Sequence, residues 1–341
     1  MPRELAVLTQ SAPQPCTYTW ACLLCDERET CRKDKEGHTR WLMNKRMALI
    51  RYKVLVFSNR GGVGKSTVTT NLAVSLALLG KEVGVVDADL HGQSIPALLG
   101  GAGQTLKISA GGAIIPFQAY SIKVASLAWL LQKESELAQD SSSAELAVSG
   151  ARAPVGVDQL IGGVEWPELD YLLLDLPPGM GNELEIVRLI GDVTGCLIIT
   201  TPQEVALRDS QKLVTALGEK GLPLIGLVEN MSERQALSPN ARARRVLPPN
   251  SPDVLAPRQE QASRAALRLG ARSSSPTGTD AVPVPFLGRI PFDPEVAAHG
   301  KAGEPFALFC SDSETAQAYH AVANQVDAFV RKQALSPLTP C

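Results

Sequence analysis

The stretch that most constrains the fold is residues 56–67, VFSNRGGVGKST, because it joins a strand-like run to a helix-like run through a glycine-rich turn. The β-branched run YKVLVFSN leads into it, and KSTVTTNLAVSLALLG follows, whose apolar spacing predicts a helix closed by Gly80. A strand, such a turn and a helix together point backbone N–H groups at phosphate oxygens. The expected ligand is therefore a nucleoside triphosphate.

The residues of this turn have distinct expected roles. Its glycines let the backbone approach the phosphates, Lys65 is expected to reach the β- and γ-phosphate oxygens, and Ser66 to coordinate Mg²⁺. The nucleotide-binding residues predicted here are Gly61, Gly62, Val63, Gly64, Lys65, Ser66 and Thr67. A dinucleotide-binding fingerprint is disfavoured because its glycines do not precede a Lys-Ser pair. Asn59 stands where the general loop pattern has glycine, and asparagine's tolerance of left-handed backbone angles is expected to preserve the turn.

Further strand-like runs follow at EVGVVDADL, DYLLLDLPP, GCLIITTP and LPLIGLVENMS. They alternate with helical stretches, which predicts an α/β fold with a doubly wound, mainly parallel sheet and right-handed crossovers. Hydrophobic residues make up 45% of the chain and aromatic residues only 5%, so the core is expected to consist of Ala, Val, Leu and Ile. Asp87 and Asp89 end the second core strand and Asp175 closes another, where acidic groups can serve a magnesium-bound nucleotide.

The chain divides by composition into two parts. Residues 1–51 are polar, charged and rich in cysteine, which predicts a small metal-binding appendage, and residues 52–341 form the predicted phosphate-loop domain. Within that domain, residues 233–280 are rich in Arg, Pro and Ser and are expected to be a flexible insertion. A solvated linker is favoured for this segment over a basic arm that binds a partner.

Charge and hydropathy exclude several classes of protein. The net charge of −2 and the pI near 6.1 lack the basic excess of a nucleic-acid binder, so no nucleic-acid partner is expected. No apolar run approaches the ~18 residues of a membrane span, and the N-terminus does not resemble a signal peptide. We therefore expect a cytoplasmic protein without a membrane partner.

The seven cysteines are unevenly distributed. Cys16, Cys22, Cys25 and Cys31 crowd one segment and are the predicted metal ligands, since four soft thiolates suit a [4Fe-4S] cluster or a tetrahedral Zn²⁺. The cluster is favoured because a zinc ribbon more often has two CxxC pairs, and a site without metal is the third alternative. Cys196 is expected to be a buried strand residue, whereas Cys310 and Cys341 show no pattern.

The loop resembles the deviant Walker A motif, GKGGVGKST, of the MinD/ParA/nitrogenase-iron-protein class of P-loop ATPases. Within that class, the chain resembles the Mrp/ApbC iron-sulfur cluster carriers. The segments that carry this likeness are VVDADLHGQSIPALLG, DYLLLDLPPGMGNE, TPQEVALRDSQK, GLVENMS and VPFLGRIPFDPEVAAHGKAGEPF. The resemblance runs from about residue 52 to 306, without the insertion, and implies a MinD-like fold and a homodimer.

The resemblance also implies residue roles. Arg60 occupies the place of the family's signature lysine, which reaches the phosphates of the other subunit, and its guanidinium preserves that charge. Asp87 would help hold the hydration shell of Mg²⁺, Asp89 would position the attacking water, and Asp175 would be the Walker B acid. Asn230 falls where the class recognises adenine, so ATP is favoured over GTP. Arg60, Lys65 and Asp89 are thus the predicted catalytic residues.

The chain departs from the family pattern at two places. The spacing from Cys22 to Cys31 resembles an N-terminal cluster site of eukaryotic relatives, but the CxxC that holds a labile cluster between subunits after ENMS is absent. The turn PPGTGDE of relatives is PPGMGNE here, with Met180 and Asn182 replacing a hydroxyl and a carboxylate. Slow or differently coupled hydrolysis is the expected consequence.

The function that the resemblance implies is an ATP-hydrolysing carrier that delivers a [4Fe-4S] cluster to apoproteins. Two alternatives stay open. One is an ATP-gated electron donor like the nitrogenase iron protein, in which the cluster remains bound. The other is a MinD/ParA-like regulatory switch, which a zinc-bound N-terminal segment would favour.

Overall fold

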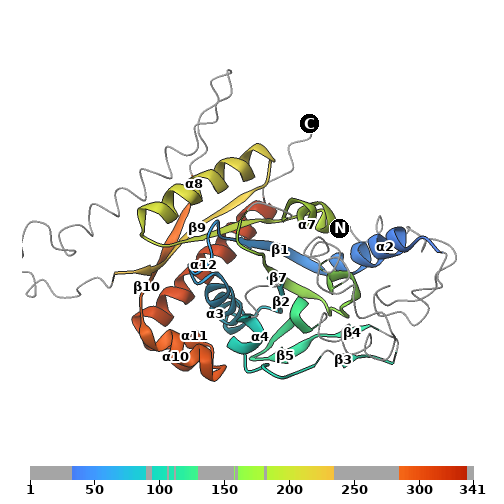
Figure 1. Cartoon of the computed structure of the whole chain (residues 1–341), viewed down its shortest axis with the longest axis horizontal. Helices are drawn as coiled ribbons and strands as arrows, with labels where there is room; N and C mark the ends of the chain where they lie inside the picture. The colour runs from blue at the N-terminus through green and yellow to red at the C-terminus, as the bar shows by residue number, and fades with distance from the viewer. Residues whose placement is uncertain are drawn as a thin grey trace, which may run out of the picture.

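The computed structural model describes residues 33–89, 94–105, 107–110, 113–129, 157, 160–179, 183–233 and 284–335 of the chain (Figure 1). These residues form a large, mainly parallel β-sheet with helices on both faces, which confirms the predicted doubly wound α/β fold. The predicted appendage up to residue 32, and residues 234–280 of the predicted insertion, lie outside the described residues.

The large sheet contains eight strands in the order β10-β9-β8-β1-β7-β2-β6-β5. They are β1 (Ile50–Phe57), β2 (Val83–Asp87), β5 (Phe117–Ala119), β6 (Ile122–Ser126), β7 (Leu169–Asp175), β8 (Gly195–Thr200), β9 (Leu224–Ser232) and β10 (Phe286–Pro291). Neighbouring strands pair in parallel except for β5, which runs antiparallel to β6 at one edge. The short strands β3 (Lys107–Ile108) and β4 (Ile114–Ile115) form a separate antiparallel pair.

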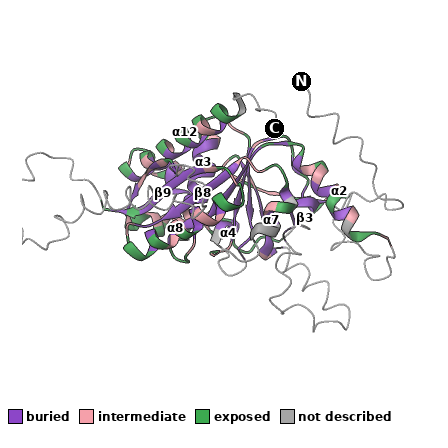
Figure 2. Cartoon of the chain, turned by 90° about the horizontal axis from the view of Figure 1, so that it is seen from above, coloured by how far each residue is buried: buried purple, intermediate pink, exposed green. Residues whose placement is uncertain are grey.

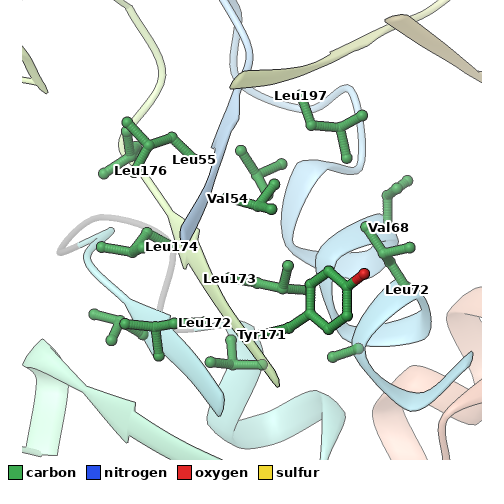
Figure 3. Close-up of a cluster of buried hydrophobic side chains, with 14 of the residues drawn as sticks. Val54, Leu55, Val68, Leu72, Tyr171, Leu172, Leu173, Leu174, Leu176 and Leu197 are labelled. Atoms are coloured by element: carbon green, nitrogen blue, oxygen red, sulfur yellow. The ribbon is translucent and has the colours of Figure 1, made fainter. Parts of the chain in front are cut away.

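The central strands are apolar on both faces because helices cover both faces of a parallel sheet. Every residue of β8 is buried, and β1 and β7 are buried along nearly their whole length. Successive side chains along a strand point to opposite faces of the sheet. In Figure 3, Leu172, Leu174 and Leu176 point to one side of the sheet. Tyr171 and Leu173 point to the other side, toward Val68 and Leu72 of the helix after β1. The predicted aliphatic core is therefore centred on these strands.

The helices lie on two faces because the crossovers run in opposite directions along the sheet. The chain passes through α3 (Lys65–Leu78) to β2 on one side of β1, and from β8 through α8 (Glu204–Glu219) to β9 on the other. Right-handed crossovers in opposite directions place α3 and α8 on opposite faces, as Figure 2 shows. The long helix α12 (Glu314–Leu335) packs against α3 and β10. The shorter helices are α4 (Ser94–Leu98), α7 (Glu183–Ile190), α10 (Pro294–Ala302) and α11 (Phe306–Phe309).

The helix before β1 belongs to the packed body. Helix α2 (Lys35–Met47) starts at the N-cap Asp34, whose Oδ1 accepts a hydrogen bond from the N–H of Gly37 over 2.8 Å. Its residues Leu42, Met43 and Met47 are buried, and α2 contacts α7. Division of the chain at residue 51 stays a prediction, but the packing joins α2 to the sheet that follows it.

Two smaller observations bear on the sequence predictions. Helix α3 is followed by Gly80 with φ of 76°, as expected for the glycine that closes this helix. Among the described helices, none has the length and hydropathy that a bilayer span requires.

Candidate functional site

The loop between β1 and α3 turns through two glycines with positive φ angles. Gly62 has φ of 82° and Gly64 has φ of 80°, a backbone region that favours glycine. A Cβ atom at Gly64 would lie only 2.4 Å from Asn230 Nδ2, so a larger residue has no space there. Helix α3 begins at the next residue, which places the unsatisfied N–H groups of its first turn at this loop. The loop therefore fits a phosphate group.

Lys65 opens α3 with a buried ammonium group. Its side chain is 6% exposed, and Nζ lies 2.9 Å from Asp175 Oδ1 and 4.0 Å from Asp89 Oδ2. The shorter distance defines an ion pair, yet its direction is not that of a hydrogen bond, and Nζ has no hydrogen-bond partner among the described residues. Buried polar groups normally have such partners. The N–H groups of Lys65 are therefore available to an anionic ligand.

Asp175 ends β7 and is fully buried beside the first turn of α3. Its Oδ2 accepts a hydrogen bond from Ser66 Oγ over 2.6 Å, and its Oδ1 lies 2.9 Å from Thr69 Oγ1. The hydroxyl of Ser66 and the carboxylate of Asp175 thus lie side by side. Both are hard oxygen ligands of the kind that Mg²⁺ prefers. The pair fits a Mg²⁺ ion that accompanies a bound nucleotide.

Asp87 ends β2 in register with Asp175 on the neighbouring strand. Its Oδ1 accepts a hydrogen bond from the N–H of Asp89 over 3.3 Å, and its Oδ2 accepts one from Ser126 Oγ over 3.1 Å. Burial, and next the negative charge of Asp175, raise the pKa of Asp87 to about 7, against the lowering effect of these hydrogen bonds and of Lys65. A cation bound nearby would favour the ionised form of this carboxyl group.

Asp89 completes the acidic group around Lys65. It follows β2, is 8% exposed, and places Oδ2 at 4.0 Å from the ammonium. The three predicted aspartates therefore gather at the carboxyl ends of β2 and β7, next to the glycine-rich loop. This is the edge at which parallel α/β sheets bind their ligands.

The two unusual residues of the loop take different positions. The guanidinium-bearing Arg60 is exposed, while its carbonyl accepts a hydrogen bond from Ser58 Oγ over 3.1 Å. Asn59 is half-buried, and its Nδ2 donates to the carbonyl of Asp209 in α8 over 3.2 Å. The turn is kept at Asn59 as expected, but without left-handed backbone angles there, because the described non-glycine residues with positive φ are Tyr120, Ser121 and Met231. Asn59 instead fixes the loop to α8 through its side chain.

Asn230 lies near the end of β9 and contacts the same loop. Its Nδ2 donates to the carbonyl of Val63 over 2.9 Å, and the side chain is buried. The amide nitrogen therefore holds the loop backbone and lies next to Gly64. Recognition of adenine by Asn230 stays a prediction, and what the structure adds is a role for this residue in fixing the loop.

Three further residues of the site were missed by the sequence analysis. Thr69 contacts Asp175, Ser126 donates to Asp87, and Asn71 joins α3 to α11 by accepting a hydrogen bond from the N–H of Ala307 over 2.8 Å. Thr69 lies one helical turn after Lys65 and Ser66, a spacing that points to the same face of α3. No sequence pattern distinguishes Ser126 or Asn71.

The cysteines divide between described and undescribed parts of the chain. The predicted metal ligands Cys16, Cys22, Cys25 and Cys31 lie outside the described residues, as do Met180 and Asn182. Cys196 is fully buried in β8, as predicted, and burial raises the pKa of its thiol to about 12. Cys310, which showed no pattern in the sequence, lies with Sγ at 3.4 Å from His299 Nε2.

A comparison with protein families matches residues 49–247 to the ParA model described as a NUBPL iron-transfer P-loop NTPase. Among curated relatives, the iron-sulfur cluster carrier protein of Saccharolobus solfataricus is 34% identical over 282 residues, which cover 82% of this chain and 84% of the relative. The carrier protein of the same description from Methanocaldococcus jannaschii is 34% identical over 298 residues, covering 86% and 91%.

Solved structures show the same fold. A nucleotide-binding protein from Archaeoglobus fulgidus in complex with ADP is 28% identical and superimposes with a TM-score of 0.53, covering 78% of this chain and 92% of that one. The cell-division ATPase MinD of Pyrococcus furiosus has a TM-score of 0.52 at 23% identity, covering 81% and 98%. At this level of identity, the similarity to MinD shows a shared fold and not a shared function.

Proposed function

Because the chain belongs to the NUBPL family of iron-transfer P-loop NTPases, we propose that it is an ATP-hydrolysing homodimer that carries a [4Fe-4S] cluster and delivers it to apoproteins. The family supports iron-sulfur transfer as the purpose of the NTPase domain. One structural observation supports nucleotide binding most strongly: the buried ammonium of Lys65 has no hydrogen-bond partner among the described residues, beside a glycine-rich loop.

The residues of the site have separate roles in nucleotide binding. The backbone of Gly62 and Gly64 surrounds the phosphates, and the ammonium of Lys65 binds their outer oxygens. Ser66 and Asp175 hold Mg²⁺ together, since their oxygens already lie within 2.6 Å of each other. An ion held by these two residues would supply positive charge next to the phosphate oxygens.

Two carboxylates serve hydrolysis. Asp87 would accept hydrogen bonds from water molecules on a bound Mg²⁺, and it would do so best in its ionised form. Asp89 lies beside Lys65 and is only 8% exposed, so it orients a water molecule from within the protein. Asn230 holds the loop in its binding shape through the carbonyl of Val63.

Arg60 acts on the nucleotide of the other subunit in this proposal. Its side chain is exposed although its backbone is hydrogen-bonded, so the guanidinium is free to reach a facing copy. A planar guanidinium binds phosphate oxygens through several donors. Each subunit would then complete the nucleotide site of its partner. The dimer would therefore close when ATP binds and open after hydrolysis.

The cluster is the cargo, and the cysteines of residues 16–31 are its proposed ligands. Four thiolates within one short segment match the ligand number of a [4Fe-4S] cluster. The chain has no CxxC after ENMS, so the proposal assigns holding and release to the N-terminal cysteines. ATP would control release through the geometry of the dimer.

The test is transfer of the cluster from the loaded protein to an apo [4Fe-4S] enzyme whose activity returns on insertion. Lys65→Ala is expected to assemble a cluster as the wild type does but to deliver it at least tenfold more slowly with ATP present. Lys212→Ala, which removes an exposed lysine from α8, is the matched control and should deliver normally. Delivery by Lys65→Ala at the wild-type rate would contradict the proposal. A cluster that stays bound while passing electrons would support the electron-donor alternative instead.

A further inference from the structure

Helix α10 and the turn after α11 bring three metal-ligating side chains together at the surface. The ligand atoms of Glu295, His299 and Cys310 all lie within 4.8 Å of one another. Glu295 and His299 are one turn apart on α10, so they project from the same face of that helix. Cys310 comes from the end of α11, and its Sγ lies 3.4 Å from His299 Nε2.

The orientation of His299 is suited to metal binding. Its Nδ1 lies 3.0 Å from Glu304 Oε2, and the neutral tautomer that donates from Nδ1 to this carboxylate presents the lone pair of Nε2 to Cys310. A carboxylate on the far nitrogen is the usual support of a metal-ligating histidine. The imidazole ring also packs edge-on against Phe306 at 5.6 Å between centroids. The ring is therefore fixed in direction before any ion binds.

The backbone around Cys310 is held by contacts outside the three ligands. The N–H of Ala307 donates to Asn71 of α3, and the hydroxyl of Tyr120 donates to the carbonyl of Gly303 over 2.8 Å. A Cβ atom at Gly303 would lie 2.5 Å from the Cα of Gly100, so the turn between α10 and α11 sits tightly on its neighbour. These contacts hold the turn between α10 and α11, from which His299 and Cys310 project on either side.

We propose that Glu295, His299 and Cys310 bind one Zn²⁺ ion, at a site distinct from the nucleotide loop and from the N-terminal cysteines. In a tetrahedral zinc site, neighbouring sulfur and nitrogen ligands lie about 3.5 Å apart, which matches the separation of Sγ and Nε2. Glu295 is exposed, so its carboxylate reaches the ion by a change of rotamer. Water from solvent supplies the fourth ligand.

The charges around the site favour a cation. Partial burial raises the pKa of the Cys310 thiol, and the carboxylates of Glu295, Asp293 and Glu304 raise it further. The surroundings of the thiol are thus negative, and the ion-pair partner of Glu304 is His299 itself. On binding Zn²⁺, the thiol of Cys310 releases its proton to solvent and binds as thiolate, with no change of redox state. Sulfur, nitrogen and oxygen ligands together suit Zn²⁺ better than Mg²⁺ or Ca²⁺.

The test is alkylation of Cys310 by iodoacetamide in the full-length protein, followed peptide by peptide with mass spectrometry. A small molar excess of Zn²⁺ over protein is expected to slow labelling of the Cys310 peptide about tenfold or more, because a zinc-bound thiolate is a poor nucleophile. Addition of a chelator should restore the original rate of labelling. Mg²⁺ should not protect. The Cys341 peptide, followed in the same digests, reports any general effect of Zn²⁺ on the reagent.

Variants separate a zinc site from a simple thiol–imidazole hydrogen bond. His299→Ala should abolish protection by Zn²⁺, and the exposed Glu295→Gln, which is expected to fold normally, should weaken it. His320→Ala on α12 is the matched histidine control and should retain protection. Equal labelling of wild-type Cys310 with and without Zn²⁺ would overturn the proposal, as would full protection in both site variants. The outcome is independent of cluster transfer, so the proposed function and this site can fail separately.

Discussion

The hydroxyl of Ser66 donates a hydrogen bond to Asp175 Oδ2 over 2.6 Å, which joins the first turn of α3 to the end of β7. The other oxygen of Asp175 is shared by Lys65 Nζ and Thr69 Oγ1, each at 2.9 Å. This completely buried carboxylate is thereby held by two hydroxyl donors and one ion pair, all from the first turns of α3. These contacts hold the loop in place, and the same oxygens are the proposed ligands of Mg²⁺.

Thr69→Val is expected to destabilise the protein because it removes a buried hydroxyl that lies 2.9 Å from both Asp175 Oδ1 and the carbonyl oxygen of Lys65. The expected loss in the free energy of unfolding is about 1–3 kcal/mol. Thr70→Val is the matched control, since the buried Thr70 hydroxyl has no hydrogen-bond partner among the described residues. That variant should be neutral or slightly more stable. Urea unfolding of both variants without nucleotide checks the difference, and equal losses would refute the assigned contact.

Asp87 is expected to make stability depend on pH. A carboxyl group with a pKa raised to about 7 by folding binds its proton more tightly in the folded chain, so its contribution is favourable at low pH. That contribution is lost as the pH rises through about 7. Asp87→Asn removes this dependence on pH, so its stability relative to the wild type should increase between pH 5 and pH 8, by at most about 3 kcal/mol.

Thermal unfolding of nucleotide-free Asp87→Asn across this range of pH is the measurement. Asp312→Asn, at an exposed position, is the matched control and should track the wild type. A constant difference between Asp87→Asn and the wild type would contradict the raised pKa. Stabilisation of the wild type by Mg²⁺-ADP should also be larger at pH 8 than at pH 6, because the cation favours the ionised carboxylate.

Gly64→Ala should weaken both stability and nucleotide binding. The added Cβ would lie 2.4 Å from Asn230 Nδ2, and φ of 80° is unfavourable for alanine, for a combined cost of about 1–3 kcal/mol. Gly61→Ala provides the comparison, since a Cβ at Gly61 meets no atom within 4 Å. In a double-mutant cycle, Asn230→Ala should recover part of the loss in Gly64→Ala. Additive effects of the two substitutions would exclude the predicted clash.

Mixed dimers test whether Arg60 acts on the partner's nucleotide. Arg60→Ala and Lys65→Ala chains should each hydrolyse ATP poorly alone, because every site lacks one group. Mixing them in equal amounts should restore about a quarter of the wild-type rate, since half of randomly paired dimers are mixed and each mixed dimer has one complete site. Arg60→Lys should retain activity as a single variant. If mixing restores nothing while exchange of subunits is confirmed, Arg60 does not act in trans.

The predictable part of the fold lies where several local signals agree. Long β-branched and leucine-rich runs indicated β1, β2, β7, β8 and β9, and their parallel arrangement placed Asp87 and Asp175 at one edge of the sheet. Helix α2 was missed because its many charged residues hide the apolar positions of Leu42, Met43 and Met47. The short strands β3, β4 and β5 are only two or three residues long and carry little periodicity.

Parts of the site depended on contacts that sequence spacing does not contain. Ser126 meets Asp87 because β6 is the neighbour of β2, and His299 meets Cys310 because α10 and α11 fold back on α4 and α3. The turn keeps its shape with Asn59 in place of glycine, as predicted. The reason is a side-chain hydrogen bond of Asn59 and not a left-handed backbone conformation. Its amide contacts α8, a helix that lies 150 residues farther along the chain.

The most direct test of the central claim is the iron and sulfide content of the full-length protein after anaerobic reconstitution. The wild type is expected to contain about four irons and four sulfides per chain, with broad absorbance at about 400 nm. Both should be lost in Cys22→Ala/Cys25→Ala and kept in the matched control Cys341→Ala. Stoichiometric zinc in the wild type, no bound metal, or a cluster that survives in Cys22→Ala/Cys25→Ala would contradict the account.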